Sequence, residues 1–146
     1  MNTARIGASR RELEKLKELA TAQGVIDDPR YRDRLTRLEV ELMALELTNL
    51  RFLDQLRGGR SPGAEVSMLK IRGTEIQQML TELAMDALGP EARVTRVIPG
   101  AADAAMARDP IAMTFAPRYC NFRKTSIYAG SNEIQRNIIA KMSLGL

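Results

Sequence analysis

The sequence contains no histidine, no tryptophan and one cysteine, Cys120. A single cysteine cannot form an internal disulfide, so a secreted disulfide-stabilised scaffold is excluded. Without histidine the chain cannot build a Ser-His-Asp triad, and we expect no zinc, haem or other metal site of the usual ligands. Because no histidine is present to activate its thiol, we expect Cys120 to be a small buried side chain and not a nucleophile.

Long apolar runs and clustered charge are also missing. No run approaches the roughly 18 apolar residues of a membrane helix, and the first residues lack the hydrophobic segment of a signal peptide. We therefore expect no membrane partner and a cytoplasmic location. The net charge is +4, but acidic residues interrupt even the densest basic run, PRYRDRLTR. We interpret this run as a solvated helix face, and we expect no nucleic-acid partner because such surfaces need clustered basic residues.

What the sequence does contain predicts an all-α fold. Hydrophobic residues make up 45% of the 146 residues but aromatics only 4%, and leucine, isoleucine, alanine and methionine favour helix over sheet. Apolar residues at helical spacing predict four main helices, over residues 3–22, 29–57, 64–88 and 131–142. Asp28 and Pro29 form a capping start signal for the second of them. We expect one domain, an antiparallel four-helix bundle.

The second predicted helix has two apolar stripes. One comprises Leu35, Leu38, Leu42, Leu45, Phe52 and Leu56, with Asn49 as its only polar member, and the other comprises Val40, Met43, Leu47 and Leu50. Two apolar faces predict neighbours on both sides, so this helix is either central in the bundle or at a subunit interface.

The remaining segments have weaker patterns. A heptad-like seam with Gly73 in it runs along the third helix, where a glycine allows another helix to approach closely. Residues 90–115 contain three prolines and no sustained period, and they predict a long loop with a short helix around 101–108. A second short helix is predicted near 118–125. In the last helix we expect Ile134, Ile138 and Ile139 to point inward.

The C-terminal stretch SIYAGSNEIQRNIIAK, residues 126–141, has a specific pattern. It closely resembles the C-terminal signature of the acyl-CoA dehydrogenase family, in which Ile-Tyr, a Glu or Gly, and Gly-Thr precede a helix with Ile-Gln-Arg and Ile-Ile-Ala. The matching residues are Ile127, Tyr128, Gly130, Ser131, Ile134, Gln135, Arg136, Ile138, Ile139 and Ala140. The third predicted helix and the closing Leu-Gly-Leu are also similar to the family, so the resemblance covers essentially the whole chain as a C-terminal helical domain.

The resemblance implies FAD-dependent desaturation of an acyl-CoA thioester between Cα and Cβ. In the family, a carboxylate removes the α proton and the flavin accepts the β hydrogen as hydride. By this likeness Tyr128, Ala129 and Gly130 are substrate-binding residues, and the backbone N–H of Ala129 is a donor to the thioester oxygen. The small Gly130 lets the backbone approach substrate and flavin closely. Ser131 and Glu133 stand where the family's side chains approach the phosphates and the adenosine half of FAD.

Three departures from the family pattern affect this assignment. Ala129 occupies the position of the catalytic Glu in many members, so we expect no catalytic residue in this chain. Another branch of the family has Gly or Ala at this site and takes its base from an earlier helix, so the resemblance implies a base on the first helix, just upstream of residue 1. Glu12 and Glu14 are the nearest acids, but their Lys/Glu pattern is typical of a solvated face. An Arg-x-x-Phe-Gly motif and a Gln-Gly-Gly ending, both flavin-binding in the family, are absent, which predicts altered or reduced flavin contacts.

The length and the start of the chain predict a fragment of a longer protein. The first helical pattern is already under way at residue 4, so we expect a truncated first helix. The family's N-terminal helical and middle β domains are absent, and we expect residues 1–146 to be a C-terminal fragment, inactive alone. The resemblance implies acyl-CoA, electron-transfer flavoprotein and other dehydrogenase subunits as partners. The alternative is a non-catalytic oligomerisation module that pairs with a complete subunit; a nucleic-acid-binding bundle is a third, less favoured hypothesis.

Overall fold

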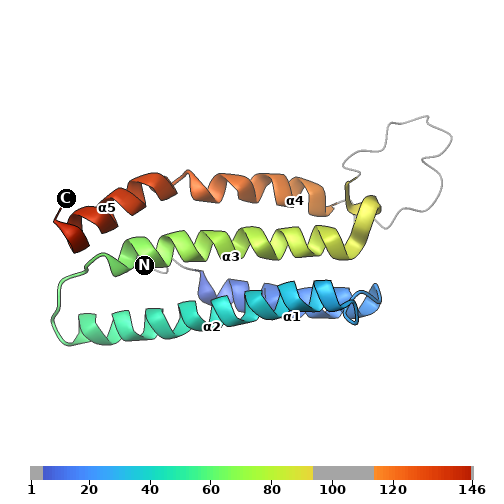
Figure 1. Ribbon diagram of the computed structural model, residues 1–146, viewed down its shortest axis with the longest axis horizontal. Helices are drawn as coiled ribbons and strands as arrows, with labels where there is room; N and C mark the ends of the chain where they lie inside the picture. The colour runs from blue at the N-terminus through green and yellow to red at the C-terminus, as the bar shows by residue number, and fades with distance from the viewer. Residues whose placement is uncertain (1–4, 94–113, 146) are drawn as a thin grey trace.

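The structure is a computed structural model that describes residues 5–93 and 114–145 (Figure 1). Within these residues it has five α-helices and two short 3-10 helices. These are α1 (Ile6–Ala22), α2 (Pro29–Arg57), α3 (Glu65–Leu88), η1 (Gly89–Arg93), α4 (Phe115–Phe122), η4 (Arg123–Ser126) and α5 (Asn132–Leu144). The predicted all-α class and the four main helices are confirmed. The predicted helix near 118–125 corresponds to α4 and η4, whereas the one around 101–108 lies outside the described residues.

The helix at the centre of the bundle is α3. It packs against α1 and α2 on one side, and against α4 and α5, which follow one another along its length, on the other (Figure 1). Of the two positions predicted for α2, the central one is therefore wrong, because α3 occupies it. Because α3 has neighbours on both sides, thirteen of its residues are buried, more than in any other described helix.

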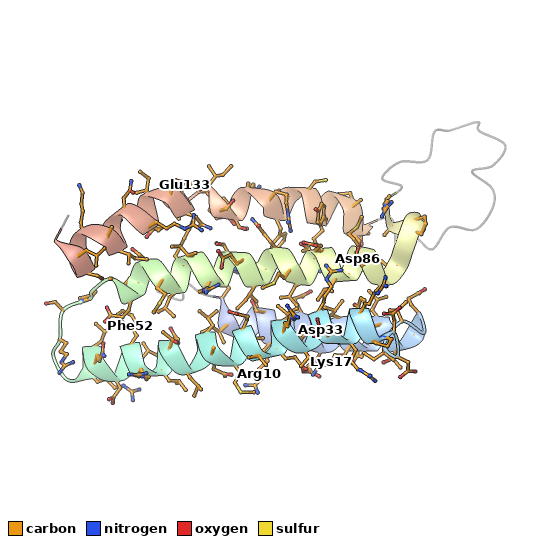
Figure 2. All side chains as sticks on the ribbon, viewed as in Figure 1. Arg10, Lys17, Asp33, Phe52, Asp86 and Glu133 are labelled. Carbon is orange, nitrogen blue, oxygen red and sulfur yellow. The ribbon has the colours of Figure 1, made fainter. Side chains whose placement is uncertain are left out.

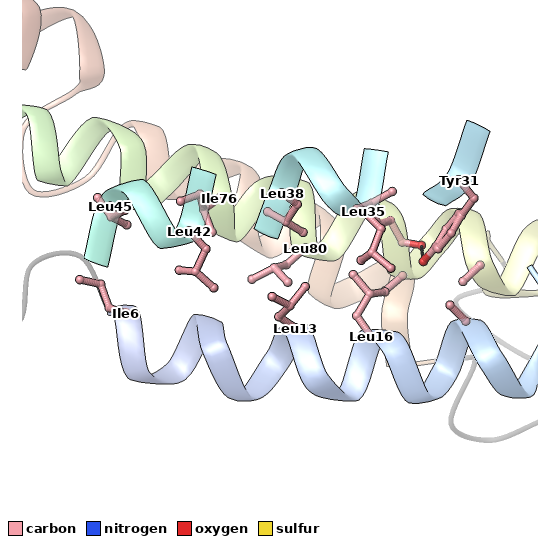
Figure 3. Packing of buried hydrophobic residues seen from close by; sticks show 14 of the residues in the cluster. Ile6, Leu13, Leu16, Tyr31, Leu35, Leu38, Leu42, Leu45, Ile76 and Leu80 are labelled. Carbon is pink, nitrogen blue, oxygen red and sulfur yellow. Dashed lines mark hydrogen bonds between the residues drawn. The ribbon is translucent and has the colours of Figure 1, made fainter. Parts of the chain in front are cut away.

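The core forms where α1, α2 and α3 meet. Figure 3 shows leucines of α1 and α2 pointing toward one another, with Ile76 and Leu80 of α3 among them. Asp28 starts α2 as predicted, because its carboxylate accepts hydrogen bonds from the N–H groups of Arg30 at 2.7 Å and Tyr31 at 3.1 Å. These two bonds lower the pKa of Asp28. The Tyr31 hydroxyl donates to the Leu83 carbonyl at 3.1 Å, and burial raises the pKa of this phenol to about 12.

Two predictions of burial are wrong. Ile134 is 52% exposed and Ile138 is also exposed, because α5 contacts α3 along one side and no other described helix covers its isoleucines. Ile139 is half-buried. Cys120 is exposed on α4, which packs against α3 through Ala116, its one buried residue. The second stripe of α2 is exposed as well, so within this chain it has no neighbour among the described residues.

Candidate functional site

The signature residues form a tight turn between η4 and α5. The backbone φ angles of Ala129 and Gly130 are 57° and 83°, both in the left-handed region. This conformation costs roughly 1–2 kcal/mol for a residue with a Cβ but not for glycine. The turn places Ser131 at the N-cap of α5, where its side chain accepts a hydrogen bond from the N–H of Ile134 at 3.4 Å. Ser131 therefore caps α5.

Two backbone donors in this turn are unused. The N–H groups of Ile127 and Tyr128 donate to the Lys124 carbonyl at 2.9 and 3.2 Å. The N–H groups of Ala129 and Gly130 donate to no group within residues 5–93 and 114–145. Tyr128 and Ala129 line a hollow of about 220 Å³ between the turn, α3 and the start of α1. The turn therefore offers hydrogen-bond donors beside a cavity, which is the arrangement that a ligand oxygen needs.

A buried lysine of α3 holds the turn in place. Lys70 is only 7% exposed, and its ammonium donates to Asn132 Oδ1 at 2.7 Å and to the Ser126 carbonyl at 3.4 Å. Thr74 adds a 3.4 Å contact to the same Asn132 oxygen. Burial lowers the pKa of Lys70, and the nearby Glu133 carboxylate opposes this shift. These bonds fix the residues on both sides of the turn to the central helix.

Our interpretation of the sequence missed Lys70 and Asn132. A lysine flanked by the apolar residues Leu69 and Ile71 was the available signal. A lysine side chain at such a position often buries its methylene groups while its ammonium reaches solvent. The sequence alone therefore did not distinguish a buried ammonium from an exposed one.

Glu133 lies in the first turn of α5 with its side chain exposed (Figure 2). Hydrogen bonds from its own backbone N–H and from the Ser131 hydroxyl lower its pKa, and Arg136 at 3.8 Å contributes in the same direction. The carboxylate is therefore ionised at neutral pH. A low pKa on the surface makes it a poor proton acceptor and a suitable hydrogen-bond acceptor.

No carboxylate among the described residues lines the hollow beside the turn. Glu14 is exposed and bonds Lys17, as expected for a solvated face. Glu12 differs from that expectation, because it is half-buried and forms an ion pair with Arg118 of α4 at 2.6 Å. Arg118 also lies over the Phe122 ring, 5.6 Å from its centroid. Glu12 therefore connects α1 to α4 and does not face the turn.

Substitutions at Ala129 and Gly130 can test the left-handed backbone conformation of the turn. A Cβ on Gly130 would lie 2.6 Å from Gln135 Nε2, the group that donates to the Ala129 carbonyl. We expect Gly130→Ala to lower the free energy of unfolding by about 1–2 kcal/mol, since it adds left-handed strain. Ala129→Gly should remove such strain and leave the protein between unchanged and about 1 kcal/mol more stable, because the unfolded chain gains entropy. Urea unfolding followed by circular dichroism measures both; equal effects of the same sign would contradict the observed turn.

The described residues contain neither a metal-binding cluster nor a membrane-spanning helix. No cluster of three or more acidic, histidine or cysteine side chains that could hold a metal ion occurs in them. None of the described helices combines the length and the apolar character required to cross a membrane.

Comparisons with a family profile and with curated proteins all identify acyl-CoA dehydrogenases. The family profile for "Acyl-CoA dehydrogenase, C-terminal domain" matches residues 1–144. The chain is 36% identical over 136 residues to acyl-CoA dehydrogenase IpdE1 of Mycobacterium tuberculosis, and 34% identical to the IpdE1 of Mycolicibacterium smegmatis. Each alignment covers 93% of this chain but 32% and 30% of the relatives, so the chain spans about a third of their length.

Solved structures share the fold. The ChsE4–ChsE5 complex from Mycobacterium tuberculosis matches with a TM-score of 0.62 and 27% identity, over 100% of this chain and 36% of that chain. The FAD complex of PigA matches with a TM-score of 0.72 over 97% of this chain and 34% of the other, and its 23% identity shows the fold alone.

Proposed function

The chain belongs to the acyl-CoA dehydrogenase family as a C-terminal domain, and we propose that it forms one wall of the acyl-CoA site of an FAD-dependent dehydrogenase. In this proposal residues 1–146 are one domain that desaturates nothing alone. The family's other two domains, supplied by the rest of the protein or by a partner subunit, complete the site. The full assembly would oxidise an acyl-CoA thioester at Cα–Cβ and pass the electrons to an electron-transfer flavoprotein.

The free N–H of Ala129 is the observation that carries this proposal. When the α proton of a thioester is removed, negative charge develops on the thioester oxygen, and donors that are already in place stabilise that charge. Ala129 sits beside the hollow with an unused donor, held there by the anchored turn. Tyr128 and Gly130 flank it. Tyr128 lines the hollow, and Gly130 leaves space where a Cβ would crowd Gln135.

The α proton of the thioester must be accepted by a residue other than Ala129, because the methyl side chain of Ala129 cannot accept a proton. Glu133 is exposed with a lowered pKa, and Glu12 is paired with Arg118. We therefore propose that the catalytic base comes from outside residues 5–93 and 114–145. The part of this chain in the proton transfer is to orient the thioester so that the α C–H faces that base.

The start of α5 fits the diphosphate and sugar part of FAD. The N-terminus of the 13-residue α5 favours an anion, and the Ser131 side chain lies at its N-cap, where its oxygen accepts from Ile134. The ionised Glu133 repels phosphate but accepts well from a ribose hydroxyl. When bound, FAD accepts the β hydrogen as hydride; Ser131 and Glu133 would hold and position the cofactor.

A second candidate function is the non-catalytic helical module. It is supported by the exposed second stripe of α2, which offers an apolar surface to another subunit. Among the relatives, ChsE4–ChsE5 is a complex of two differently named chains. In this case the turn would be a structural remnant and the free N–H of Ala129 would contact no substrate.

The single cysteine permits a direct experiment. Residues 1–119 made as a thioester can be ligated to a synthetic peptide 120–146 that begins with Cys120, and lactic acid in place of Ala129 replaces its N–H by an ester oxygen. The ligated chain is assembled with the subunits that co-purify with the tagged protein. Flavin absorbance and acyl-CoA desaturation are then measured. Relative to the all-amide ligated chain, we expect kcat/KM to fall by roughly 10²–10³ with flavin content unchanged.

Two outcomes would contradict the proposal. An active assembly with the same kcat/KM for the ester and amide chains would exclude Ala129 as a donor. An assembly containing this chain that binds no flavin and desaturates no acyl-CoA would favour the non-catalytic module.

A further inference from the structure

A groove continues from the turn along the bundle, between α1 and the α4–η4 segment and above α3. Three hollows form it. The one beside the turn shares Arg5 and Gln77 with a middle hollow of about 70 Å³. The middle hollow shares Glu12, Thr81 and Arg118 with a third hollow of about 80 Å³. A ligand whose reacting end lies at Ala129 would extend into this groove.

The middle hollow has a polar lining that the fold itself does not use. Ser9 is 2% exposed, and its hydroxyl has no hydrogen-bond partner within the part of the chain that the structure describes. Gln77, with its side chain buried in the central helix, lines the same hollow. Buried hydroxyl groups are almost always paired, because an unpaired one loses its hydration without compensation. The Ser9 hydroxyl therefore faces a place where a partner is expected.

The charged side chains nearby do not supply that partner. Arg118 is already paired with Glu12, and this ion pair connects α4 to α1 at the border between the middle and the third hollow. The Thr81 hydroxyl donates to the Gln78 carbonyl at 2.8 Å and accepts from Arg123 at 3.0 Å. Arg5 also lines the middle hollow, but it is exposed to solvent. Around Ser9 and Gln77, where the Arg118 and Glu12 charges compensate each other, the hollow favours a neutral hydrogen-bonding group over an ionised one.

We infer that the acyl group bound in this groove carries a neutral oxygen substituent, a hydroxyl or a ketone, which Ser9 and Gln77 bind. The inference rests on the proposed function and specifies its substrate class. A plain alkyl chain would fill the same volume and leave the Ser9 hydroxyl unpaired, whereas an oxygen at this depth satisfies it. Polar sites of this kind discriminate strongly against a ligand that lacks the matching group.

The test compares two acyl-CoA thioesters of equal carbon number on the purified assembly, one with a hydroxyl or ketone on the acyl chain and one unsubstituted. We expect the oxygenated thioester to have the higher kcat/KM. Ser9→Ala should lower kcat/KM for that thioester by about tenfold or more, with less than about twofold change for the alkyl thioester. Ser67→Ala is the control, because this buried serine lines none of the three hollows and should affect both substrates equally.

The outcomes separate the two proposals. If the assembly prefers the alkyl thioester, or if Ser9→Ala changes both substrates to the same extent, the inference is wrong and the dehydrogenase function stands, with water as the occupant of the middle hollow. If the assembly desaturates neither thioester nor any other acyl-CoA, the proposed function fails and the inference fails with it.

Discussion

Leu38→Ala is expected to lower the free energy of unfolding by about 3–4 kcal/mol. Leu38 is 0% exposed and lies on α2 in the core shared with α1 and α3. Removing three carbons from this position loses their transfer free energy, and it leaves a cavity that three packed helices cannot close. The measurement is urea unfolding of the purified chain, with the slope of the transition checked for two-state behaviour.

The same helix provides a matched control. Leu50→Ala makes the same chemical change in α2, with the same helix propensity, but Leu50 is 57% exposed. In the isolated chain we expect it to change the free energy of unfolding by less than about 0.5 kcal/mol. If Leu38→Ala and Leu50→Ala lowered the free energy of unfolding of the monomer equally, the structure's assignment of a buried and an exposed face to α2 would be wrong.

The Leu50 variant also reports on assembly. The exposed stripe of α2 has no cover in the described chain, so any large effect of Leu50→Ala that depends on protein concentration would come from a partner on this face. Measuring the variant at two concentrations that differ by about a hundredfold distinguishes an intrinsic effect on the helix from loss of an interface.

Local signals predicted the helices well because each signal acts within a few residues. Asp28 and Pro29 start α2 where predicted, and the spacing of Leu38 and its neighbours identified the buried stripe. The inward assignment of Ile134 failed for a different reason. An apolar residue at helical spacing indicates that a face will be covered, but it does not say whether the same chain covers it.

The candidate site was predictable only in part. The motif located the turn, and the structure adds the free N–H of Ala129 and the cap at Ser131. The contacts that hold this turn come from α3, more than fifty residues earlier, and no local pattern links Lys70 to Asn132. Ser9 was missed for the same reason, since its hydroxyl is notable only because the fold buries it without a partner.

Lys70→Met is expected to loosen the turn and α5 while the rest of the bundle stays folded. Methionine keeps the apolar part of the side chain and removes the ammonium that binds Asn132 Oδ1 and the Ser126 carbonyl. Hydrogen bonds to a charged group contribute roughly 1.5–3 kcal/mol, but removing a buried charge also removes its desolvation cost. We therefore expect a net loss of about 2 kcal/mol for the region that contains Asn132.

Hydrogen exchange localises this effect. The amides of α5 should exchange about tenfold or more faster in Lys70→Met, since about 1.4 kcal/mol of local stability corresponds to a factor of ten. The amides of α1 and α2 should change little. Lys15→Met is the control, because its side chain is 71% exposed and its contact with Glu12 is a surface ion pair.

A double-mutant cycle identifies the partner. If the Lys70–Asn132 bond anchors the turn, Asn132→Ala added to Lys70→Met should cost much less than the sum of the two single variants, with a coupling energy of about 1–2 kcal/mol. Additive losses, or faster exchange spread evenly over α1, α2 and α5, would show that Lys70 supports the whole bundle and not the turn. With the predicted coupling, the position of the Ala129 N–H depends on the buried Lys70–Asn132 contact between the central helix and the start of α5.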